Sequence, residues 1–116
     1  GPNPDLINQI QKFLVSELSR YEVKIEDVAK HLGYSVRSLQ RYLKDRDTSF
    51  THVLDATRET LAKKYLLDEK ISIAEISFLL GFAEQSTFQR AFRRWAKTSP
   101  LQWRKQALAQ KNAKSV

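Results

Sequence analysis

One internal repeat limits the folds that this chain of 116 residues can adopt. Gly33 and Gly81 lie 48 positions apart, and the residues before and after them match in type. One residue is then inserted, and the match resumes at an offset of 49. The matched residues are Ile25, Val28, Leu32 and Tyr34 with Ile73, Ile76, Leu80 and Phe82, and then Leu39, Gln40, Arg41, Leu43 and Lys44 with Phe88, Gln89, Arg90, Phe92 and Arg93. We therefore expect two copies of one small structural unit.

Each copy has the pattern of two short helices separated by a sharp turn. Apolar residues recur at steps of three and four, which is the periodicity of a helix with one buried face. Glycine tolerates the positive φ that such a turn needs, so Gly33 and Gly81 are assigned to the turns. The pattern predicts a helix-turn-helix, and in DNA-binding versions the second helix lies in the major groove.

The second helix of each copy has a polar, basic side opposite its apolar side. The outward residues are Arg37, Gln40, Arg41 and Lys44 in the first copy, and Ser86, Gln89, Arg90, Arg93 and Lys97 in the second. Arginine and glutamine form paired hydrogen bonds with guanine and adenine edges. The helical spacing of Phe88, Phe92 and Trp95 favours core positions over a base-stacking platform.

The remaining segments also have helical periodicity, and no alternating run indicates a strand. We expect helices over about 6–18, 25–32, 36–46, 50–67, 73–80 and 85–97, and a last helix from Ser99-Pro100. Expected N-caps are Ser35, Ser49 and Ser72, with Asn3 or Asp5 before the first helix. The predicted fold class is all-α, with about seven helices and two helix-turn-helix units joined by a long linker helix.

These elements divide the chain into five segments. Residues 1–4 form a disordered start, 5–48 the first helix-turn-helix unit, 49–69 the linker helix, 70–109 the second unit with its closing helix, and 110–116 a polar, frayed tail. The chain has no methionine, and Gly1-Pro2 is typical of a protease remnant, so we expect a piece of a longer protein. A linker of about 18 residues spans about 27 Å, close to the roughly 34 Å between successive major-groove faces. One chain is thus expected to reach two adjacent groove segments as a monomer.

Charge is segregated along the chain, whose formal net charge is +7. Residues 73–116 carry eight basic and two acidic side chains. Arg37, Arg41 and Lys44 form a second basic group without an intervening acid. A segregated basic surface suits a polyanion such as double-stranded DNA, although a solvated face would have the same composition.

Several function classes lack the residues that they need. The chain has no cysteine and three glycines, which excludes thiol chemistry, cysteine zinc sites and phosphate-cradling glycine loops. His31 and His52 have no further residues that would complete a metal site. No nucleophile elbow occurs, and no apolar run approaches the roughly 20 residues of a membrane span. We therefore expect no enzyme activity, no cofactor, no metal and no membrane partner.

Two stretches carry a family resemblance. LGYSVRSLQRYLKDRDTSF resembles the first helix-turn-helix of the AraC/XylS family of bacterial transcription regulators, and GFAEQSTFQRAFRRWAKTSPLQWRK resembles the second. The resemblance covers about residues 6–106. It implies a homeodomain-like, DNA-binding regulator, more often an activator than a repressor. The implied partners are operator DNA, RNA polymerase and a separate effector-binding or dimerisation domain, in the cytoplasm at the nucleoid.

The resemblance also implies roles for individual residues. On the first reading helix it implies base or backbone contacts from Arg37, Gln40 and Arg41, and phosphate contacts from Ser35, Ser38 and Lys44. On the second it implies base contacts from Gln85, Ser86, Thr87 and Gln89, and phosphate contacts from Arg90 and Arg93. The chain departs from the family at Asp47 and Lys97, where glycine is common, and at Trp103, where tyrosine is common.

A protein-interaction module built on the same scaffold is the alternative function. Such a module should present an exposed apolar patch, whereas both predicted outer faces are polar and basic. An enzyme is the weakest alternative, because no catalytic constellation is present in the sequence.

Overall fold

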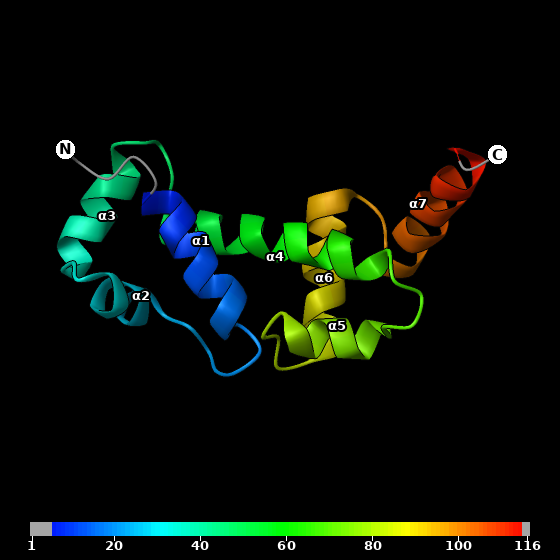
Figure 1. The fold of residues 1–116 in the computed structure, drawn as a ribbon, viewed down its shortest axis with the longest axis horizontal. Helices are drawn as coiled ribbons and strands as arrows, with labels where there is room; N and C mark the ends of the chain where they lie inside the picture. The colour runs from blue at the N-terminus through cyan, green and yellow to red at the C-terminus, as the bar shows by residue number, and fades with distance from the viewer. Residues whose placement is uncertain (1–5, 115–116) are drawn as a thin grey trace. The chain divides into compact units, whose positions relative to one another are not determined.

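The computed structural model describes residues 6–114 and, within that range, contains helices and no strand (Figure 1). The helices are α1 (Leu6–Glu17), α2 (Ile25–Leu32), α3 (Val36–Lys44), α4 (Phe50–Leu66), α5 (Ile73–Leu79), α6 (Gln85–Ala96) and α7 (Pro100–Lys114). The predicted all-α fold class with about seven helices is confirmed over these residues. The expected start at residues 1–4 and the caps at Asn3 or Asp5 lie outside the described residues.

The described chain divides into two compact units, 6–58 and 59–114. The boundary falls inside α4, so this one helix contributes its first half to one unit and its second half to the other. Each unit contains one helix-turn-helix, α2–α3 in the first and α5–α6 in the second. The finer division into five segments stays a prediction.

The first unit is built around a core of aliphatic side chains. Helix α2 contacts both α1 and α3. The best-buried side chains, each 1% exposed or less, are Leu6, Ile10 and Leu14 of α1, Val28 of α2, and Leu39 and Leu43 of α3. Within α1 and α3 these residues recur every four positions, as the helical periodicity of the sequence predicts, so that periodicity accounts for the buried side of each helix.

The second unit has an aromatic core. Phe88 and Phe92 on α6 are fully buried, and their rings meet edge to face with centroids 5.9 Å apart. Phe82, in the turn after α5, lies 5.6 Å from Phe88, and Trp103 of α7 lies 6.1 Å from Phe92. The prediction that Phe88 and Phe92 belong to the core rather than to a base-stacking platform is confirmed. Trp95, the third residue of that prediction, is half-buried, with its ring centroid 6.3 Å from that of Phe92.

Helix starts follow the predicted serine caps. The Ser35 hydroxyl oxygen accepts the Ser38 backbone N–H at 3.0 Å, and Ser72 accepts that of Glu75 at 3.0 Å. Ser49 accepts the His52 N–H at 3.1 Å. Each cap satisfies one of the backbone donors that a helix leaves without a partner in its first turn.

The helix ends differ from the predictions in two ways. Helix α7 continues to Lys114, so the expectation that the tail frays after Ala109 is wrong for the described residues. Alanine, glutamine and lysine dominate that segment, and all three have high helix propensity. Helix α3 ends at Lys44, two residues earlier than predicted, because residues 45–47 form a turn.

Four of the residues between 6 and 114 adopt positive φ. Gly33 and Gly81 have φ of 79° and 82°, as predicted for the turns of the two helix-turn-helix units. Asp47 and Lys97 have φ of 56° and 64°. These are the two positions where glycine is common in the family, and here the left-handed backbone is kept without glycine.

Candidate nucleic-acid interface

Helix α3 presents its predicted DNA-facing side chains to solvent. Leu39 and Leu43 are buried on its inner side, at 0% and 1% exposure. All six predicted contact residues around this helix are exposed, namely Ser35, Arg37, Ser38, Gln40, Arg41 and Lys44. The structure therefore brings these residues together on one accessible helix and its N-cap.

The turn before α3 sets the direction of this helix. Gly33 occupies the left-handed position, its N–H donates to the Lys30 carbonyl at 3.3 Å, and the Tyr34 N–H donates to the Ala29 carbonyl at 2.9 Å. These bonds close the C-terminus of α2 in the manner of a Schellman motif. Ser35 then caps α3, so its hydroxyl is already engaged in local structure.

Helix α6 has the same two-sided arrangement. Phe88, Ala91 and Phe92 are buried at 3% exposure or less. The predicted contact residues Gln85, Ser86, Thr87, Arg90 and Arg93 are exposed, and Gln89 is half-buried. The two helices therefore share a buried inner side and an exposed or half-exposed outer side.

Ser77 and Glu84 were not predicted from the sequence as parts of this site. Ser77 on α5 is 3% exposed, and its hydroxyl donates to the Glu84 carbonyl at 3.3 Å. This bond ties the residue that precedes α6 to α5. The exposed Glu84 carboxylate makes no cap bond to α6 and accepts the Ser86 hydroxyl at 3.5 Å, so an acid stands at the N-terminus of the second reading helix.

Arg46 is a further cation that the sequence analysis did not single out. Its guanidinium carbon lies 3.6 Å from the centre of the Tyr42 ring, and its Nη1 donates to the Tyr42 carbonyl at 3.2 Å. Stacking on the ring and the hydrogen bond hold the guanidinium near the end of α3. A Tyr–x₃–Arg spacing at a helix end was the available sequence signal.

Arg58 on α4 interacts with acids of its own unit. Burial lowers the pKa of its guanidinium, whereas the neighbouring Asp55 and Glu22 carboxylates raise it. With these intramolecular partners, Arg58 is not one of the candidate DNA contacts.

His31 packs against an aromatic ring of α1. Its imidazole stacks on the Phe13 ring with centroids 4.5 Å apart. Within residues 6–114, no group of three or more His, Cys, Asp or Glu side chains is arranged to hold a metal ion.

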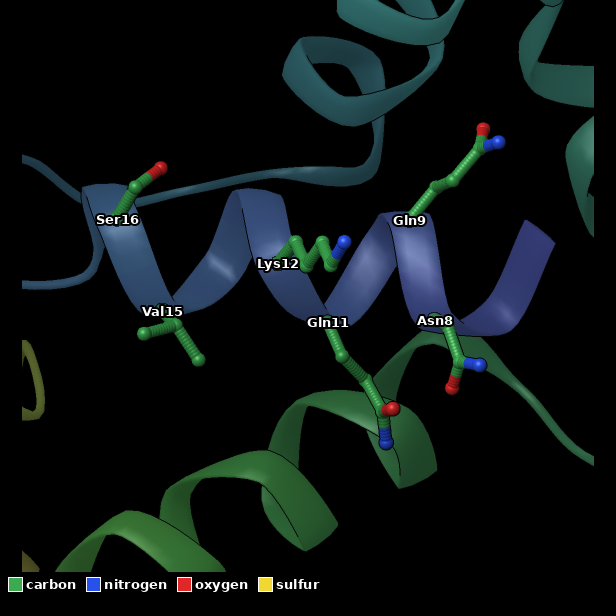
Figure 2. A pocket seen from close by; sticks show the side chains of 6 residues that line it. All are labelled: Asn8, Gln9, Gln11, Lys12, Val15 and Ser16. Atoms are coloured by element: carbon green, nitrogen blue, oxygen red, sulfur yellow. The ribbon is translucent and has the colours of Figure 1, made fainter. Parts of the chain in front are cut away.

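A surface hollow follows α1. It is lined by Asn8, Gln9, Gln11, Lys12, Val15 and Ser16. Figure 2 shows that these side chains diverge, with Gln9 and Ser16 on one side of the helix and Gln11 and Val15 on the other. Because the polar groups do not converge, the hollow offers no set of ligands for a cofactor or substrate.

Comparison with known proteins identifies the family. A family described as "Helix-turn-helix domain" matches residues 28–106. The probable transcription factor PqrA of Proteus vulgaris is 34% identical over 102 residues, which cover 86% of this chain and 84% of that protein. The chain belongs to the AraC-type helix-turn-helix family. It is a DNA-binding domain of the kind found in transcription regulators.

Two further comparisons concern a longer regulator and a domain that was solved together with DNA. The ornithine utilization regulator of Pseudomonas aeruginosa is 35% identical over 99 residues, which cover 85% of this chain and 29% of that regulator. The chain thus spans less than a third of that relative's length. The DNA-binding domain of AdpA, solved in complex with a target DNA, superposes with a TM-score of 0.78 over 93% of this chain and 97% of that one, and at 20% identity it shows the shared fold.

The exposed apolar residues of this AraC-type domain do not lie on its reading helices. Among the described residues, the large exposed hydrophobic side chains are Val15, Tyr21, Tyr34, Leu67, Phe78 and Leu101. None of them belongs to α3 or α6. The protein-interaction alternative, which needs an apolar patch on those faces, therefore has no support there. No helix in the described part of the chain is long and apolar enough to cross a membrane.

Proposed function

We propose that this AraC-type domain reads a two-block operator by inserting α3 and α6 into adjacent major-groove segments of one duplex. The observation that carries the proposal is the repeated arrangement of a glycine turn, a buried apolar side and an exposed polar, basic side on both helices. This arrangement suits a helix that docks in a groove and contacts both bases and phosphates.

In this proposal each side chain takes one of two roles. Arg37, Gln40 and Arg41 on α3, and Gln85, Ser86, Thr87 and Gln89 on α6, contact base edges or the adjacent backbone. Phosphates are contacted by Ser35, Ser38, Lys44, Arg90 and Arg93. Base contacts provide discrimination between sequences, whereas phosphate contacts provide affinity and orientation.

The larger biological setting is part of the same proposal. The domain acts within a bacterial transcription regulator, in the cytoplasm at the nucleoid. An activator recruits RNA polymerase, and a separate domain binds the effector or a second subunit. Relatives that are transcription regulators several times longer than this chain support this setting.

Selection of bound sequences from a random duplex pool tests the proposal. We expect a consensus of two blocks whose centres lie about one helical turn apart, because each reading helix occupies one groove segment. Arg41→Ala should weaken the base preference at positions in one block, and Gln89→Ala should weaken it at positions in the other. A single-block consensus, or one block altered by both variants, would contradict the two-helix arrangement.

A further inference from the structure

Two neighbouring side chains of α7 connect this helix to different parts of the second unit. Arg104 is 9% exposed. Its Nε donates to the Leu66 carbonyl at 2.7 Å, and its Nη2 donates to the carbonyls of Asp68 at 3.1 Å and Ile71 at 2.6 Å. A single guanidinium therefore binds the end of α4 and both ends of the segment that leads to α5.

The chemistry of these partners explains why arginine stands here. Carbonyl groups in the last turn of a helix have no intrahelical donor and carry the negative end of the helix dipole. A guanidinium offers five N–H groups in a planar fork, and can satisfy carbonyls that converge from different directions. The Asp68 carboxylate is engaged elsewhere, since its Oδ1 accepts the Lys70 N–H at 3.0 Å.

Trp103 makes the second connection. Its ring meets that of Phe92 edge to face, with centroids 6.1 Å apart and planes at 79°. The ammonium of Lys63, on the second half of α4, lies 6.0 Å from the centre of the Trp103 ring. Because Phe92 is on the inner side of α6 and directly precedes Arg93, Trp103 contacts the reading helix from behind its DNA-facing side.

We propose that Arg104 is a positioning residue for the second reading helix. It fixes the segment 67–72, from which Ser72 starts α5, and through Trp103 the same helix α7 is packed against α6. The orientation in which α6 presents Gln89 and its neighbours then depends on the Arg104 hydrogen bonds. This inference rests on the proposed function, because it concerns the discrimination that α6 provides.

The test compares binding to two duplexes well below the melting temperature of each variant. One duplex carries both selected blocks, and the other has the α6 block scrambled. In Arg104→Ala the preference for the intact duplex should fall by about tenfold or more, which is about 1.4 kcal/mol, because misplaced side chains lose paired contacts with base edges. Affinity for the duplex with only the α3 block should stay within about twofold, since the first unit is untouched.

Chemical rescue separates positioning from a general loss of stability. Millimolar methylguanidinium should occupy the three carbonyls left by Arg104→Ala and restore part of the preference, whereas methylammonium at the same concentration should not. Arg104→Lys keeps the charge without the planar fork, and should lie between the wild type and the alanine variant. Lys105→Ala removes the same charge from the adjacent exposed position, and should keep the wild-type preference.

Each result decides one question. If folded Arg104→Ala or Arg104→Lys keeps the full preference, the positioning role is overturned. If Arg104→Ala does not fold, the same comparison is made with Arg104→Lys alone. If the wild type prefers neither duplex, the proposed function fails instead, and amide hydrogen exchange in Arg104→Ala then tests the inference. Faster exchange of residues 67–72 together with α6 supports the link between them. Faster exchange of residues 67–72 alone overturns it.

Discussion

Lys97 has a left-handed backbone conformation, which is unfavourable for any residue with a Cβ. Its φ of 64° places it in the left-handed region at the C-terminus of α6, where its N–H donates to the Arg93 carbonyl at 2.9 Å. For a residue with a Cβ this conformation costs about 1–2 kcal/mol, and glycine avoids that cost but loses about 0.5–1 kcal/mol in chain entropy.

Lys97→Gly should therefore raise the free energy of unfolding by about 0.5–1 kcal/mol. Denaturant titration of the purified chain measures this difference. Lys97→Ala is the matched control, because it removes the same ammonium but keeps the Cβ, and it should leave the free energy of unfolding nearly unchanged. Equal stabilisation by both variants would assign the effect to charge rather than to backbone strain.

Single substitutions should distinguish residues that contact bases from residues that contact phosphates. Arg41→Ala and Gln89→Ala should each lose about 1–3 kcal/mol of discrimination at particular base pairs, because a paired hydrogen bond to a base edge is removed. Arg93→Ala should weaken binding to specific and random duplexes alike. Equilibrium titrations on both duplex types check this, and equal losses on both for all three variants would count against base contacts by Arg41 and Gln89.

At the scale of single helices, the caps make a local and testable contribution. Ser72 starts α5 and accepts the Glu75 N–H, and it is not among the candidate DNA contacts. Ser72→Ala should lower the free energy of unfolding by about 1 kcal/mol, because one backbone donor in the first turn of α5 loses its capping partner. Ser72→Asp should restore most of that loss, and Ser19→Ala, in the turn after α1, should have no effect. Thermal or denaturant unfolding gives the values.

Local sequence patterns predict helices better than they predict the contacts between them. Ser35, Ser72, Gly33 and Gly81 were predictable, because caps and left-handed turns depend on residues within four positions. The inner sides of α3 and α6 followed from periodicity alone.

Contacts between distant residues had no such signal. Arg104 reaches Leu66, a residue 38 positions earlier, and Ser77 reaches Glu84 across a turn. An arginine on a basic helix has the same sequence pattern whether it is exposed or buried, so its three carbonyl partners could not be predicted. Lys97 is a different case. The family resemblance marks its position as one where glycine is common, but lysine itself favours an ordinary helical conformation, so the residue type did not indicate the left-handed backbone.

At the scale of the whole molecule, the dependence of DNA affinity on salt tests whether both units act in one complex. Each lost phosphate contact should reduce the slope of log K against log salt concentration by about 0.9. Lys44→Ala alters the first unit and Arg93→Ala the second. In the double variant the steepness of this slope should fall by about 1.8 if both residues contact the same duplex. Gln89→Ala should keep the slope of the wild type, because it removes no phosphate contact. A double variant no shallower than the singles would argue against simultaneous contact.

Helix α4 runs from Phe50 to Leu66 and crosses the boundary between the units at residues 58 and 59. Val53 and Thr57 are buried before that boundary, and Leu61, Ala62 and Leu66 after it. Dissection of the protein between residues 58 and 59 would cut this helix near its middle and leave each fragment with a new helix end whose backbone groups lack partners. A domain boundary for expressing either unit alone therefore has to lie beyond α4 rather than between residues 58 and 59, so that the whole helix stays with the fragment.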